Sequence, residues 1–215
     1  MPHRRLVAFA ALILLVIPQM AAAHITKTGS GGFTAGFEHP LSGYDHFLAM
    51  FSVGLWGAQM GGRRVWSLPV TFPMIMVIGG VVGILGVPVP GIEVGIALSI
   101  VVLGLAIGAA WKPAEWVSLA IIAVFGFYHG YAHGAELPMA ADPADYAIGF
   151  VLATGFIHVV GVGVGLVLNP IWKGRLSQAL GLFVAFVGLG FLALALGYLQ
   201  SQLGFLNGGL SIFGS

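Results

Sequence analysis

Two short segments hold most of the side chains of this chain that could do chemistry. Residues 39–46 end in an Asp-His pair, and residues 129–136 carry two histidines one helical turn apart and a glutamate after them. The rest of the chain is almost entirely apolar, because 59% of all residues are hydrophobic and only 7% are charged. An ionisable side chain in an apolar membrane segment costs roughly 2.5–3.5 kcal/mol, so such clusters indicate an ion pathway, a proton relay or a metal site.

The types of these side chains favour a metal. Imidazole and carboxylate groups without thiolate suit a borderline divalent ion such as Ni(II), Co(II) or Zn(II). The chain has no cysteine, which excludes a thiolate site and a cysteine nucleophile, and its net charge of +1 gives no sign of a nucleic-acid partner. His46, His129 and His133 form the core of the predicted site, while Asp45 either binds the metal or orients an imidazole. The candidate ligands are His24, His39, Asp45, His46, His129, His133, Glu136 and His158.

Several of these residues also have a structural interpretation. A lone histidine inside a membrane segment, such as His158, is often a hydrogen-bonded packing residue. His39 and Glu136 fit an interfacial position as well as a ligand role. Glu38 and Glu93 are expected to be solvated groups at helix ends.

Six apolar segments must position these residues, and each is long enough to cross about 30 Å of hydrocarbon as a helix. They predict an all-α integral membrane protein in which residues 24–215 form one six-helix domain. The 34 glycines suit helices that pack closely in lipid. The predicted spans are about 41–60, 65–87, 92–111, 116–137, 146–168 and 176–199, and residues 200–215 are left open as a tail or a half-buried return.

Residues 1–23 are typical of a secretory signal peptide. Two arginines precede an apolar core that is shorter than the about 20 residues of a span, and a run of alanines follows. Cleavage after Ala23 would leave His24 at the new amino terminus, where its imidazole and α-amine could chelate a metal. The alternative is an exposed tail residue.

The basic residues predict the orientation of the chain. If residue 24 lies outside, the inner loops carry five basic residues and the outer side carries one, as the positive-inside rule requires. Both mature termini are then periplasmic in a multi-pass protein of the bacterial inner membrane. The two polar segments lie in the outer half of the membrane, with His158 deeper. The basic residues are Arg63, Arg64, Lys112, Lys173 and Arg175 inside, and Lys27 outside.

The polar segments resemble a known family. The patterns His39-Pro-x-x-Gly-x-Asp45-His46 and Phe127-Tyr-His129-Gly-x-Ala-His133-Gly-x-Glu136 are similar to the signature segments of the HupE/UreJ proteins. The resemblance extends over the whole chain. It implies a nickel permease or metal-uptake accessory that serves hydrogenase or urease maturation indirectly. Ni(II) is then the substrate, no tightly bound cofactor is expected, the bilayer is a partner, and a homo-oligomer stays open.

Two other functions remain open at this point. Ser42, Asp45 and the histidine pair resemble, in spacing only, the signatures of membrane hydrolases of the alkaline ceramidase type, in which histidines could hold Zn(II) and activate a water. The order of those motifs differs here, so no catalytic residue is predicted. The second alternative is a periplasmic metal sensor or assembly subunit that does not transport.

Overall fold

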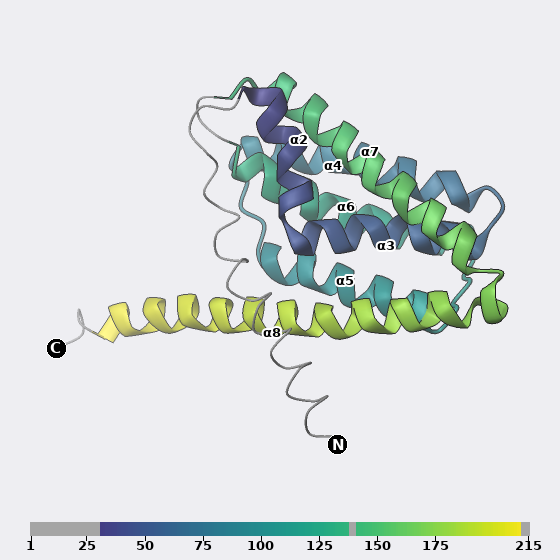
Figure 1. Cartoon of the computed structure of the whole chain (residues 1–215). Coiled ribbons are helices and arrows are strands. Elements are labelled where there is room, and N and C mark those ends of the chain that lie inside the picture. The colour runs from purple at the N-terminus through teal and green to yellow at the C-terminus, as the bar shows by residue number, and fades with distance from the viewer. Residues whose placement is uncertain (1–30, 138–140, 212–215) are drawn as a thin grey trace, which may run out of the picture.

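A computed structural model describes residues 31–137 and 141–211 of the chain, with side chains up to residue 201. These residues form helices and no strand, which confirms the predicted all-α class (Figure 1). The helices are α2 (Gly32–Ser42), α3 (Tyr44–Met60), α4 (Arg64–Ile84), α5 (Ile92–Gly108), α6 (Glu115–Ala135), α7 (Pro143–Leu168), the short η2 (Ile171–Gly174) and α8 (Arg175–Ser211).

Three stretches of the described chain are long and apolar enough to cross a membrane. They are α4, α7 and the segment Ile171–Ser201, and α5 is a shorter apolar helix. These helices indicate a membrane protein. Crossing by six helices stays a prediction, and the signal peptide and His24 lie outside the described residues.

The helices differ from the predicted spans mainly at the two ends of the chain. The first described helix, α2, starts at Gly32, which is nine residues before the expected start of the first span at about residue 41. Glycine is a poor helix former. At Gly36, however, the lack of a side chain lets α2 approach α7 so closely that an added Cβ would collide with the carbonyl oxygen of Tyr146. Tertiary packing against α7 therefore stabilises α2. At the other end, α8 continues to Ser211, past the other helices (Figure 1).

Glycines allow three further pairs of helices to approach closely. At each contact an added Cβ would meet atoms of the neighbouring helix at less than van der Waals distance. The contacts advance in the same direction along α4 and α6 and along α3 and α7, so these pairs are parallel, whereas α5 and α8 are antiparallel. The contacts are Gly79 with Phe127 and Gly83 with Tyr131, Gly54 with His158 and Gly165 with Ala58, and Gly104 with Ala185 and Gly108 with Leu182.

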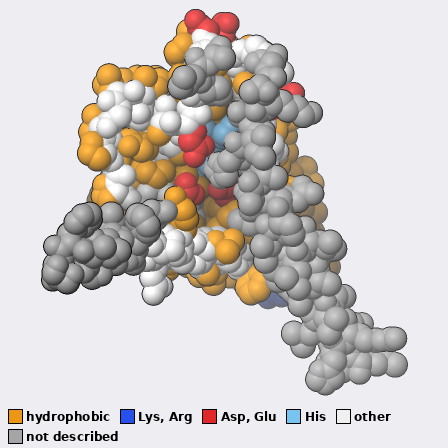
Figure 2. Space-filling view, turned by 90° about the vertical axis from the view of Figure 1, so that its left-hand side faces the viewer, with side chains coloured by type: hydrophobic (Ala, Val, Ile, Leu, Met, Phe, Trp, Pro, Cys, Tyr) orange, Lys and Arg blue, Asp and Glu red, His pale blue; other side chains and the backbone are white. Residues whose placement is uncertain are grey.

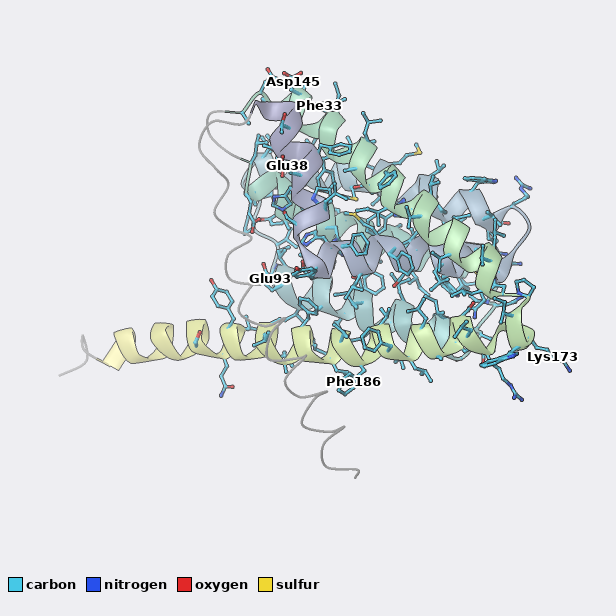
Figure 3. All side chains as sticks on the ribbon, viewed as in Figure 1. Phe33, Glu38, Glu93, Asp145, Lys173 and Phe186 are labelled. Carbon is cyan, nitrogen blue, oxygen red and sulfur yellow. The ribbon has the colours of Figure 1, made fainter. Side chains whose placement is uncertain are left out.

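The two ends of the bundle carry different chemistry. Glu38, Glu93 and Asp145 lie at one end, which we call the acidic end, and Lys173 lies at the other (Figure 3). At the Lys173 end, the indole N–H of Trp56 donates to the carbonyl of Trp111 at 3.0 Å. Three acidic residues thus lie at the end opposite Lys173, and the orientation of the bundle in the membrane stays a prediction.

Candidate metal centre

Four histidines from three helices meet near the acidic end of the bundle. His39 comes from α2, His46 from α3, and His129 and His133 from α6. The ring centroid of His133 lies 4.6 Å from that of His39 and 4.5 Å from that of His46, and the centroids of His46 and His129 are 4.8 Å apart. The fold therefore brings together the two polar segments, which are far apart in the sequence. A histidine surface with carboxylates near it is visible on this face of the molecule (Figure 2).

Asp45 orients His46. Its Oδ1 atom accepts the backbone N–H of His46 at 2.8 Å and lies 2.8 Å from the Nδ1 atom of the same residue. The carboxylate also sits in the first turn of α3, where the helix dipole favours negative charge. With Nδ1–H donating to Asp45, the buried Nε2 atom of His46 has no hydrogen-bond partner. This is the arrangement in which a carboxylate holds a histidine for metal binding.

Ser99 of α5 determines the tautomer of His129. The Ser99 hydroxyl donates to the carbonyl of Ile96 at 2.6 Å, so its oxygen is left to accept a proton from a neighbour. The Nε2 atom of His129 lies 3.0 Å from that oxygen and must be the donor. The Nδ1 atom of His129 then carries a lone pair, and it is buried without a partner.

His133 lies in the middle of the four histidines and is 4% exposed. Neither of its ring nitrogens has a hydrogen-bond partner, and its ring packs 4.0 Å from that of Phe150 on α7. Leaving buried polar atoms unpaired costs about 1–3 kcal/mol each. His46, His129 and His133 each present at least one such nitrogen, so the donor set fits a divalent ion that prefers imidazole.

The rings do not yet point at a common centre. Among the described residues, no three histidine, aspartate or glutamate side chains already converge where a metal ion would fit. His39 packs edge to face on His133 at 87°, and His46 on His129 at 88°. Edge-to-face packing directs a ring edge at a neighbouring face, so metal binding requires the imidazoles to rotate toward one point.

The remaining candidates lie around the cluster or away from it. Glu136 ends α6 and is exposed, as are Glu38 and Glu93. Glu136 and Glu93 nevertheless act on His46 electrostatically. Negative charge beside a group of histidines attracts cations. His158 does not join the cluster, because it lies deeper on α7.

The Ser42 hydroxyl donates to the carbonyl of His39 at 3.0 Å. The Ser42 hydroxyl therefore satisfies a carbonyl in the last turn of α2, and its proton is not donated to an imidazole. The geometry gives no support to a serine nucleophile at this position.

Sequence reasoning missed three residues that contact the histidines. Ser99 is the only hydroxyl residue in the α5 segment, so its isolation in an apolar helix was a usable signal. Phe72 and Phe150 offered no such signal, since they are two of 15 phenylalanines.

Comparisons with known proteins identify the family of the chain. A family model described as HupE / UreJ protein matches residues 12–191, which include the four clustered histidines. Protein HupE of Rhizobium leguminosarum bv. viciae is 38% identical over 184 residues, which cover 86% of this chain and 92% of that protein. No solved structure matches the chain.

Proposed function

The chain belongs to the HupE/UreJ family, and from that premise we propose that it carries Ni(II) from the periplasm across the inner membrane to supply hydrogenase or urease maturation. The observation that carries the proposal is the set of three buried histidines, each with an uncommitted ring nitrogen. Imidazole selects the borderline metals, and the family narrows the choice to nickel.

The acidic end supplies the first step of uptake. Exposed carboxylates there raise the local concentration of a hydrated cation. The histidines then replace part of its water shell, with His46 held in place by Asp45. Inward movement is favoured by the membrane potential, which contributes about 2.3 kcal/mol per charge per 100 mV.

Nickel entry into sealed proteoliposomes tests this function. We expect saturable uptake by the wild-type protein, reported by a nickel-sensitive dye inside the vesicles. His46→Ala and His133→Ala should each reduce the rate by about tenfold or more, because even groups that only orient metal ligands cost that much when removed. Ser118→Ala is the control, since Ser118 is buried but bonds to the Glu115 carbonyl at the far end of α6.

The competing functions give different results in the same preparation. Tightly bound zinc with lipid hydrolysis and no nickel flux would identify the membrane hydrolase. Nickel binding without flux would identify a sensor or assembly subunit. Either result would refute transport.

A further inference from the structure

His158 is a buried histidine that the outer cluster does not use. It lies on α7 and is 1% exposed, and neither ring nitrogen makes a hydrogen bond. Burying an imidazole without hydrogen-bond partners costs free energy unless a ligand binds it. The polar groups around His158 on α7 and α4 indicate which kind of ligand would bind.

The buried face of α7 leads from the cluster to His158. Tyr146, Phe150, Thr154 and His158 follow one another at four-residue intervals, and all four are buried. Phe150 packs on the ring of His133. Thr154 comes next, and its hydroxyl oxygen is also buried without a partner. At 1.5 Å per residue, His158 lies about 12 Å further along the helix than Phe150.

Helix α4 offers an oxygen to His158. Pro73 has no backbone N–H, so the carbonyl of Pro69 lacks its usual helical donor four residues later. The His158 ring lies beside this carbonyl, although the two do not meet in hydrogen-bond geometry. In a membrane, such an oxygen must be buried in protein or line a cavity. The imidazole of His158 thus lies beside a backbone carbonyl of α4 and one helical turn beyond the Thr154 hydroxyl.

Phe72 contacts both the outer cluster and His158. Its ring is fully buried, and its centroid lies 5.4 Å from that of His129 and 5.4 Å from that of His158. The two histidines are therefore neighbours of the same aromatic ring.

We propose that His158, the Thr154 hydroxyl and the Pro69 carbonyl form a second, inner metal-binding station, which the ion reaches from the outer histidine cluster past Phe72. The inference rests on the proposed function of nickel uptake. Conduction needs sites that bind well enough to be entered and weakly enough to be left. A station with one imidazole and two neutral oxygens binds more weakly than three imidazoles, so it favours onward movement.

The test compares nickel binding with nickel uptake in the same purified protein. His158→Leu should leave binding at the outer cluster unchanged within about twofold and slow uptake by about tenfold or more. Thr154→Val keeps the shape of the side chain and should slow uptake less. Thr71→Val is its control, because the Thr71 hydroxyl donates to the Ser67 carbonyl on α4 and should leave uptake unchanged.

A double variant separates this role from a purely structural one. If His158 serves only to satisfy the Pro69 carbonyl, Pro73→Ala restores the missing N–H donor, and His158→Leu combined with Pro73→Ala should transport normally. We expect uptake to remain slow. Recovery of uptake in the double variant would overturn the inner station.

Other experimental results would overturn the inner station or the transport function. Wild-type uptake rates in His158→Leu, or the loss of nickel binding together with uptake, would overturn the inner station alone. If His158→Leu does not fold, His158→Gln takes its place, and normal uptake by that variant would overturn the proposal. Absence of nickel uptake by the wild-type protein would instead refute the transport function.

Discussion

His133 has no hydrogen-bond partner at either ring nitrogen, whereas its neighbours His46 and His129 each have one nitrogen fixed by another residue. Asp45 fixes Nδ1 of His46, and Ser99 fixes Nε2 of His129. Two histidines are therefore held in one tautomer, whereas no hydrogen bond fixes the tautomer of the third. At the scale of residues, the hydrogen bonds that orient His46 and His129 reduce the entropy lost on binding.

Asp45→Asn tests the orienting role of the carboxylate. The amide can no longer stabilise the Nδ1–H of His46 as a carboxylate does, so we expect nickel affinity to fall by about 10- to 100-fold. Isothermal titration with Ni(II) in detergent measures this change. Asp145→Asn is the control, since Asp145 is an exposed carboxylate at the same end. Unchanged affinity in Asp45→Asn would exclude an orienting role.

Two buried serines form a matched pair for the second test. Ser99 and Ser118 are both fully buried, and each donates to the carbonyl three residues before it. Ser99→Ala also leaves the Nε2–H of His129 without an acceptor, which costs about 1–3 kcal/mol. We therefore expect both a lower melting temperature and weaker nickel binding in Ser99→Ala, but no loss of nickel binding in Ser118→Ala. Equal nickel affinities would refute the tautomer assignment.

At the scale of elements, close contact between helices positions the ligands. His129 and His133 lie on α6, whose glycines pack on the backbone of α4. Lipid provides no hydrophobic drive for this association, so van der Waals contact between small residues supplies it. Any side chain at these contacts would push α6 away and shift both histidines.

Gly130→Ala should therefore destabilise the protein. The added Cβ would collide with the carbonyl oxygen of Met76, which is backbone and cannot move aside cheaply. Overpacking of this kind costs about 1–3 kcal/mol. Gly155→Ala on α7 is the control, because a Cβ there would meet nothing within 4 Å. Thermal unfolding in detergent compares the two, and equal melting temperatures would contradict the packing argument.

At the scale of the whole molecule, the acidic end and the Lys173 end lie at opposite ends of the bundle (Figure 3). The parallel pairs α4–α6 and α3–α7 and the antiparallel pair α5–α8 are the pairs expected if the helices from α3 to α8 alternate in direction. A cation that enters at the acidic end thus meets the histidine cluster first.

Cysteine labelling tests this orientation in cells. The chain has no cysteine, so single cysteines report without background. We expect Asp145→Cys to react with a membrane-impermeant maleimide from the periplasm, and Lys173→Cys to react only after the membrane is opened. Both positions are exposed. Labelling of the two variants from one side would contradict the proposed topology.

The sequence alone predicted the all-α class and the proximity of the histidines of the two polar segments. Apolar segments of span length predicted six of the helices, and the histidines of the two polar segments could be paired because alternating spans put both segments at one depth. It did not predict α2, because its glycines disfavour a helix until α7 provides a surface to pack on. For Asp45, the alternatives of binding and orienting stayed open.

The tertiary structure decided how the histidines face one another. Helical periodicity predicts that His129 and His133 share a face, but the direction of that face depends on how α6 rotates against its neighbours. The glycine contacts with α4 determine this rotation, and it directs His129 toward Ser99 on α5 and His133 toward His39 and His46. Such contacts join residues that are distant in the chain, so only the packed bundle specifies them.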